Sequence, residues 1–143
     1  MKIVFIGAGN LASNLSKTFA GLGHAVLQVI SKTSSSASTL ACEFKCPFSD
    51  NINETDTRAD LYFICVNDNA IEDVVEQMPL VNGIVVHTSG TVPMNVFKDK
   101  FKNYGVFYPC QTFSRFRTVD LKKVNVLIEA INPEVEKQLR QFA

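Results

Sequence analysis

The segment VFIGAGNLA, residues 4–12, constrains the fold of this chain more than any other feature. An apolar run ends in two glycines, Gly7 and Gly9, separated by one small residue, and a helix-like pattern follows at once. Gly7 permits a sharp turn from a buried strand into a helix, and Gly9, which lacks a β-carbon, lets an anionic group approach the backbone. Free amides at the start of that helix, together with its dipole, attract phosphate. The segment therefore predicts a phosphate-binding turn. The alternative is a glycine turn that binds nothing.

Short apolar runs alternate with longer amphipathic or polar segments along the rest of the chain. The predicted strands cover residues 2–6, 25–30, 61–66, 84–87, 105–108 and 124–129, with a weaker strand at 44–48, and helical spacing occupies residues 11–19, 70–78 and 133–142. Strands that are apolar throughout and separated by helices form parallel sheets covered on both faces. We therefore expect an α/β fold, a doubly wound and mostly parallel sheet of the Rossmann type. A length of 143 residues fits one such domain, residues 1–143.

The glycines form part of a GxGxxA fingerprint. Ala12 takes its third position, where a small residue lets the helix pack tightly on the strand. Because the fingerprint lies between a strand and a helix, and a second strand follows, it predicts a dinucleotide site. The residues that we expect to bind the cofactor here are Gly7, Ala8, Gly9, Asn10, Leu11 and Ala12.

The end of the second predicted strand indicates which dinucleotide is bound. An NAD site usually places Asp or Glu about 20 residues beyond the glycines. Here Ser31, Lys32 and Thr33 occupy that place, and the next acid is Glu43. A carboxylate would repel a 2′-phosphate, whereas the Lys32 ammonium and two hydroxyls can bind one. The sequence thus favours NADP over NAD, the alternative being a solvated lysine. We expect residues 31–38, rich in serine, to form a ligand loop rather than an inert linker.

Other strands also end in polar residues, and parallel strands deliver these to the same edge of the sheet. Residues 66–68 should lie beside the riboses of the cofactor, with the Asp68 side chain capping the helix that follows. His87 is a candidate general acid or base, although a hydrogen-bonded structural histidine is the more common case. Ser89 and Gly90 are candidates for a small pocket beside the nicotinamide.

Composition excludes several classes of protein. Lys and Arg number 14 and balance 14 Asp and Glu, so a general nucleic-acid binder is disfavoured. No stretch approaches the roughly 18 apolar residues of a membrane span, and no signal peptide opens the chain, so we expect a cytoplasmic protein. No cluster of ligand residues indicates a metal site, and the four cysteines are expected to be reduced thiols.

Four motifs in order resemble a known family. These are IGAGNLA, CVNDNAI (65–71), HTSG (87–90) and YPCQTFS (108–114). Together they are similar to two-domain, Rossmann-like NADP-dependent oxidoreductases, in which a nucleotide-binding domain precedes a helical domain of unknown function. More distantly they resemble pyrroline-5-carboxylate reductase, the deazaflavin-dependent NADP oxidoreductases, and the 6-phosphogluconate and 3-hydroxyisobutyrate dehydrogenases.

The resemblance implies further contacts. It implies that the Val66 and Asn67 backbone packs against the cofactor, and that Gln111 and Thr112 face the substrate cleft, a buried and internally satisfied loop being equally plausible for the latter pair. It also implies a C-terminal helical domain, and with it a homodimer. We expect that domain to be missing from an excised chain, rather than the chain to be naturally short.

Two functions stay open at this point. One is the NADP-binding domain of an oxidoreductase that transfers hydride between the cofactor and an unidentified small substrate. The other is a non-catalytic, NADP-binding regulatory or scaffold module, because a fold does not establish catalysis.

Overall fold

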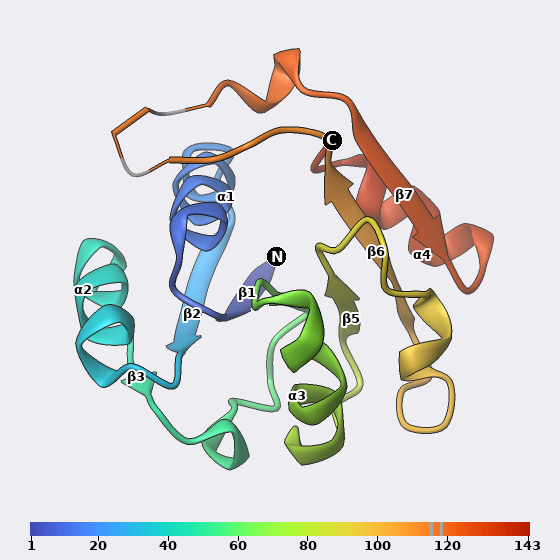
Figure 1. Cartoon of the computed structure of the whole chain (residues 1–143), viewed down its shortest axis with the longest axis horizontal. Coiled ribbons are helices and arrows are strands. Elements are labelled where there is room, and N and C mark those ends of the chain that lie inside the picture. The colour runs from blue at the N-terminus through green and yellow to red at the C-terminus, as the bar shows by residue number, and fades with distance from the viewer. Residues whose placement is uncertain (115, 118) are drawn as a thin grey trace.

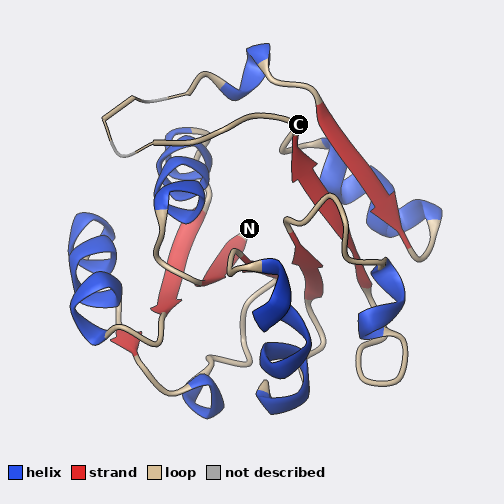
Figure 2. Cartoon of the chain, in the orientation of Figure 1, coloured by secondary structure: helices blue, strands red, loops and turns tan. Residues whose placement is uncertain are grey.

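A computed structural model of the chain describes residues 1–114, 116–117 and 119–143. Within these residues seven strands form one sheet, in the order β3-β2-β1-β4-β5-β6-β7 (Figures 1 and 2). The strands are β1 (Lys2–Ile6), β2 (Ala25–Ile30), β3 (Phe48–Ser49), β4 (Leu61–Ile64), β5 (Ile84–His87), β6 (Tyr104–Pro109) and β7 (Val126–Ala130). The α-helices are α1 (Asn10–Gly21), α2 (Ser34–Phe44), α3 (Ile71–Gln77) and α4 (Pro133–Arg140). Short 3-10 turns are η1 (Ile52–Glu54), η2 (Asp68–Ala70), η3 (Met94–Phe97) and η4 (Leu121–Lys123).

The sheet is doubly wound, which confirms the predicted fold class. All neighbouring strands from β3 to β6 pair in parallel, and β7 alone of the described strands lies antiparallel, on the outer edge of β6. Helices α1, α2 and α4 bury their apolar residues on one face, and α3 and η3 bury theirs on the other. The carboxyl ends of the parallel strands therefore meet at one edge, where ligands bind in such sheets.

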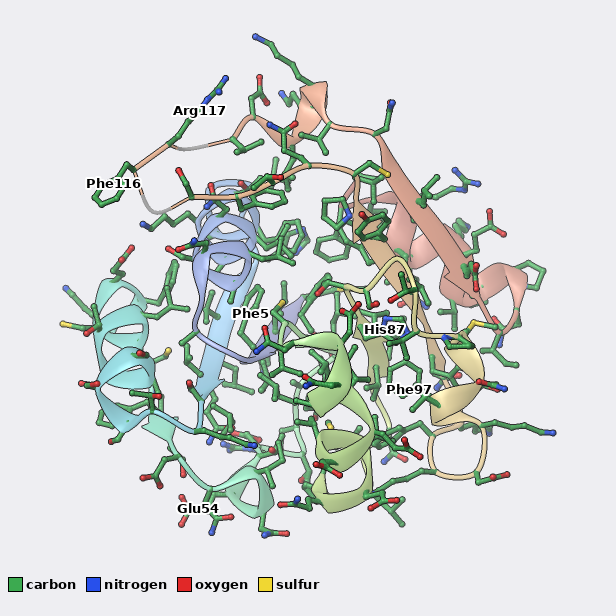
Figure 3. The ribbon with its side chains drawn as sticks, viewed as in Figure 1. Phe5, Glu54, His87, Phe97, Phe116 and Arg117 are labelled. Atoms are coloured by element: carbon green, nitrogen blue, oxygen red, sulfur yellow. The ribbon has the colours of Figure 1, made fainter. Side chains whose placement is uncertain are left out.

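A cluster of phenylalanines fixes α1 on the sheet. The Phe19 ring lies 5.2 Å from the ring of Phe63 on β4 and 4.9 Å from that of Phe142, measured between centroids. Phe5 of β1 and Phe107 of β6 complete the group around Phe63, and Figure 3 labels Phe5 among the core side chains. Aromatic contacts of this kind contribute about 0.5–1.5 kcal/mol each beyond the area that they bury. The N-terminus of α1 is thereby held at the carboxyl edge of the sheet.

Residues 34–38, which we expected in a loop, form the first turns of α2 instead. Ala37, Leu40 and Ala41 are buried and recur at the i, i+3, i+4 spacing of a helical apolar stripe. Lys45, in the left-handed region with φ of 52°, ends the helix. The burial of this stripe outweighs the weak preference of serine for turns, so only residues 31–33 of the serine-rich segment remain outside regular structure.

Strand β2 contains a bulge. Ile3 of β1 lies opposite Val26, but the next residue, Val4, lies opposite Gln28, so Leu27 is an extra residue in β2. One inserted residue switches every following side chain to the other face of a sheet. Gln28 and Ile30 consequently share the face of Val4 and Ile6, the face that α3 covers.

No helix within the described residues is long and apolar enough to cross a membrane. The cysteines Cys42, Cys46, Cys65 and Cys110 are all free.

Candidate dinucleotide site

Gly7 is required by the geometry of the turn after β1. Its φ is +108°, a backbone conformation that residues with a side chain rarely adopt. A β-carbon there would lie 2.2 Å from the carbonyl oxygen of Cys65. The Gly7 amide donates to the Ile30 carbonyl at 2.7 Å, so this residue is confined between the ends of β2 and β4. The turn thus brings three strand ends into contact.

Gly9 lies in open space at the start of α1. It is the N-cap residue, its φ of −82° is accessible to any residue, and a β-carbon built on it meets nothing within 4 Å. No side chain caps α1, and its first turn holds no acid. The first amides of a helix have no partner within the helix, so they are available to an anion that approaches Gly9. This arrangement fits a pyrophosphate group.

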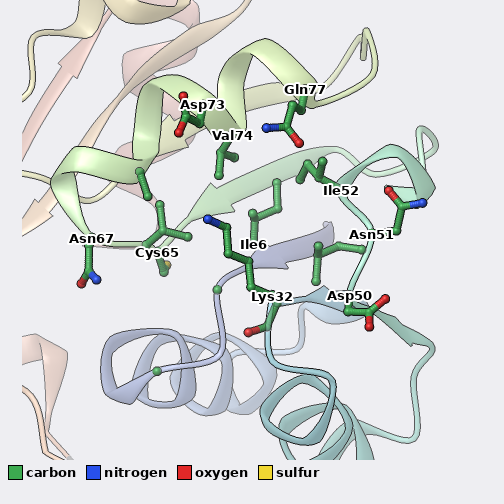
Figure 4. Close-up of a pocket in the computed structure, with 16 residues that line it drawn as sticks. Ile6, Lys32, Asp50, Asn51, Ile52, Cys65, Asn67, Asp73, Val74 and Gln77 are labelled. Atoms are coloured by element: carbon green, nitrogen blue, oxygen red, sulfur yellow. The ribbon is translucent and has the colours of Figure 1, made fainter.

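A cleft of about 590 Å³ opens beside this turn (Figure 4). Six of the residues that we predicted from the sequence line it: Gly7, Gly9, Ser31, Lys32, Val66 and Asn67. Its volume lies in the range typical of small-molecule and cofactor sites. The carboxyl ends of β1, β2 and β4 therefore all line this cleft.

The other predicted cofactor residues lie around the cleft. Ala8 and Asn10 line a neighbouring depression between α1 and α2, and Thr33 is the N-cap residue of α2. Leu11 and Ala12 pack into the core, as a small third fingerprint residue should. The Asn10 amide donates to the Phe113 carbonyl at 3.3 Å, so this side chain is held by the segment after β6.

Sequence reasoning missed two further parts of the lining. One is Asp50, Asn51 and Ile52 after β3, and the other is Ala70, Asp73, Val74 and Gln77 around α3. The residues of α3 carried a signal in their helical spacing, but residues 50–52 belong to a polar, aperiodic stretch that carried none.

The end of β2 carries a positive charge and no acid. The exposed Lys32 side chain extends into the cleft (Figure 4), and it forms no ion pair among the residues that the structure describes. The first turn of α2 follows immediately, again without an acid and without a side-chain cap. Asp50, which follows β3, lies next to this end, because the Ser31 amide donates to the Ser49 carbonyl at 3.1 Å and Ser49 pairs with Ile30. Lys32 is thus available to an anionic group.

The end of β4 contributes backbone rather than reactive side chains. Burial raises the pKa of the Cys65 thiol to about 12, so the sulfur stays protonated at neutral pH and is a poor nucleophile. The prediction that the Asp68 side chain caps a helix is wrong, because neither η2 nor α3 has a side-chain cap. Asp68 instead accepts a 2.7 Å hydrogen bond from the Thr91 hydroxyl. This bond ties the loops after β4 and β5 together.

Residues 2–89 match the family model for NADP oxidoreductases, coenzyme F420-dependent. The chain belongs to this family. A search of curated proteins gives no match. Among solved structures, a protein from Bacteroides fragilis assigned as an NADP oxidoreductase is 38% identical, with a TM-score of 0.88 over 99% of this chain and 56% of that one.

Two more distant solved structures share the fold. A 1-pyrroline-5-carboxylate reductase from Streptococcus pyogenes is 13% identical, with a TM-score of 0.76 over 99% of this chain and 54% of that one. A prephenate dehydrogenase from A. aeolicus, solved with NAD+, is 11% identical, with a TM-score of 0.78 over 99% and 56%. The chain thus spans just over half the length of these proteins. Membership of the NADP oxidoreductase family supports a nicotinamide cofactor.

His87 does not line the cleft of this chain. It is fully buried at the end of β5, where its ring lies 5.4 Å from that of Phe97, and Figure 3 labels both. Its Nδ1 accepts a hydrogen bond from the Ser89 amide at 3.2 Å, whereas Nε2 has no partner among the described residues. Burial lowers the pKa of the imidazole, which keeps it neutral. The role of His87 stays a prediction.

The remaining substrate-side candidates are also apart from the cleft. Ser89 is buried and its hydroxyl accepts bonds from the amides of Thr91 and Val92, while Gly90 lies against the Tyr108 ring. Gln111 and Thr112 are exposed after β6. Their roles stay predictions.

The segment after β6 crosses the first turns of α1 (Figure 1). Besides the bond from Asn10, the Asn14 side chain accepts a bond from the Val119 amide at 3.2 Å. This segment therefore covers part of the helix whose amino end the cofactor would approach.

In the described part of the chain, no group of three or more His, Cys, Asp and Glu could hold a metal ion.

Proposed function

We propose that this chain is the NADP-binding domain of an oxidoreductase that transfers hydride between NADP and an unidentified small substrate. The observation that carries the proposal is the uncapped, acid-free start of α1, which meets open space at Gly9 on the rim of the 590 Å³ cleft. The pyrophosphate would take the Gly7–Ala12 turn, and the ribose next to the nicotinamide would lie along the Val66 and Asn67 backbone. Calorimetry with NADPH and with NADH tests this proposal directly. A protein that binds neither ligand would overturn it.

The selection of NADP over NAD belongs to the end of β2. The 2′-phosphate would lie between the Lys32 ammonium, the hydroxyls of Ser31 and Thr33, and the amides that open α2. No Asp or Glu ends β2, so the usual hydrogen-bond acceptor for a free 2′-hydroxyl is missing from that strand. A charge-assisted contact at this point would favour the phosphorylated cofactor.

Replacement of Lys32 by Asp should shift the cofactor preference toward NAD by roughly tenfold or more, because one charge-assisted hydrogen bond is lost and a repulsive charge is added. The quantity to measure is the ratio of the dissociation constants for NADP and NAD. Lys98→Asp, at the exposed end of η3 and outside the cleft lining, makes the same charge change and should leave that ratio unaltered. A wild-type ratio in Lys32→Asp would show that Lys32 takes no part in selection.

A bound nicotinamide cofactor would donate or accept the hydride, and the chain's own residues would bind the cofactor and orient its nicotinamide toward the substrate. Hydride transfer also needs the substrate in near-attack geometry and shielded from water. The strand-end loops form one wall of such a site. We propose that a helical domain supplies the other wall, within the same polypeptide or from a second subunit of a homodimer.

We therefore expect residues 1–143 to bind NADPH with little or no turnover. The measurement compares NADPH oxidation by this chain with that by a version extended through a helical domain, across a panel of small carbonyl and imine compounds. Robust turnover by residues 1–143 alone would show that the catalytic site is complete within them. Binding by both versions with turnover by neither would favour a regulatory module instead.

A further inference from the structure

Gln28 is a buried amide inside an otherwise apolar strand. The sequence of β2 is AVLQVI, and Gln28 is only 7% exposed. The bulge at Leu27 turns this side chain toward the face of the sheet that α3 and η1 cover. A buried amide costs free energy unless its polar atoms are hydrogen-bonded, so its partners indicate what it does.

Both polar atoms of Gln28 are bonded to the backbone of one segment. Its Nε2 donates to the Glu54 carbonyl at 2.9 Å, and its Oε1 accepts from the Asp56 amide at 2.7 Å. These backbone groups lie beyond β3, which is only two residues long, so no sheet ladder holds them. Gln28 takes the place of that ladder and fixes the η1 segment to β2.

The η1 segment forms the outer wall of the cleft. Asn51 and Ile52 line it on one side, and Val74 of α3 lines it on the other (Figure 4). The segment is stiffened internally, because the Ser49 hydroxyl bonds to the Glu54 carboxylate and also accepts from the Asn51 amide at 3.0 Å. The backbone bond from the Ser31 amide to the Ser49 carbonyl holds the start of this segment to β2. Beyond it, the position of η1 relative to β2 depends on the two bonds of Gln28 and on the burial of Ile52 against the core.

We propose that Gln28 is a positioning residue for the adenine end of the cofactor, and this rests on the proposed dinucleotide function. Ile52 and Val74 offer apolar surfaces to the two faces of a flat ring, and Asn51 and Gln77 offer amides to its polar edge. This part of the cleft adjoins Lys32 at the end of β2. It lies away from the loops after β5 and β6, so it takes the adenine and not the nicotinamide.

The test compares two ligands in Gln28→Leu. NADPH carries adenine, whereas reduced nicotinamide mononucleotide does not. Leucine fills a similar volume but leaves the Glu54 carbonyl and the Asp56 amide unpaired, so the wall loosens. The dissociation constant for NADPH should rise roughly tenfold, as expected for two lost hydrogen bonds, while that for the mononucleotide stays within about twofold of wild type. NADPH affinity equal to wild type, or equal weakening of both ligands, overturns the proposal.

Tyr62→Phe is the matched control. The Tyr62 hydroxyl donates to the Asp56 carbonyl at 2.9 Å and accepts from the Ala59 amide at 3.2 Å, so it holds the chain between η1 and β4. Unlike Gln28, it forms no hydrogen bond to η1 itself. This variant should have a lower melting temperature and an unchanged NADPH affinity. If it weakens NADPH as much as Gln28→Leu does, general destabilisation explains the effect and the proposal is wrong.

A second variant covers the case in which Gln28→Leu does not fold. Ile52→Ala truncates the wall itself, and it should weaken NADPH and spare the mononucleotide in the same way. An unaltered NADPH affinity in Ile52→Ala would show that adenine does not lie against Ile52, and it would overturn the proposal. Wild-type protein that binds neither NADPH nor NADH overturns the proposed function instead, so the two failures are distinguishable.

Discussion

Replacement of Gly9 by valine should reduce NADP affinity by on the order of a hundredfold or more, because its methyl groups would occupy the space where phosphate meets the first amides of α1 and several charge-assisted hydrogen bonds would be lost. The fold should survive, since Gly9 has an ordinary φ and a β-carbon there meets nothing within 4 Å. Calorimetry gives the affinity, and circular dichroism with thermal melting reports the fold. Gly9→Ala adds a single carbon and should show a smaller loss. A folded Gly9→Val protein with wild-type affinity would place the pyrophosphate elsewhere.

Gly7→Ala should damage stability rather than binding alone. The change forces a side-chain-bearing residue to φ of +108° and puts a β-carbon 2.2 Å from a backbone oxygen that cannot swing away. Strained backbone and overpacking each cost about 1–3 kcal/mol, so the free energy of unfolding should fall by about 2–6 kcal/mol. Urea titration measures this fall.

The control for Gly7→Ala is Gly21→Ala at the end of α1. No atom lies within 4 Å of a β-carbon built on Gly21, and alanine is the better helix former, so stability should hold or rise slightly. Equal stability of Gly7→Ala and wild type would mean that the backbone relaxes around the added carbon. The confinement of Gly7 described above would then be wrong.

The parts of the fold that the sequence predicts well are those with a local cause. The turn at Gly7 and Gly9 depends on residues adjacent in the chain, and the buried parallel strands are apolar throughout. Pro133 begins α4 as predicted, with the Asn132 side chain accepting from the Val135 amide. Local chemistry was sufficient for each of these elements.

Prediction from sequence failed where distant contacts decide the structure. Asp68 is a residue type that often caps helices, yet its carboxylate accepts a hydrogen bond from the hydroxyl of Thr91, which is distant in the sequence. The start of α2 has the composition of a loop, but the apolar residues of this helix are buried in the core, and their burial stabilises it. Gln28 fixes the outer wall of the cleft through its hydrogen bonds to the backbone of Glu54 and Asp56. No pattern in the sequence around residues 50–52 indicates this contact with β2.

The phenylalanine cluster has a consequence for how this protein folds. Phe5 and Phe19 belong to the first strand and helix, whereas Phe107 and Phe142, which pack on Phe19, come from the last third of the chain. During synthesis the nucleotide-binding turn therefore emerges long before the aromatic partners that anchor its helix. Contacts of such large sequence separation slow folding and leave apolar surface exposed in the meantime. The first half of the chain should depend on chaperones, or on the arrival of the second half, before α1 is held firmly enough to present its amino end to a ligand.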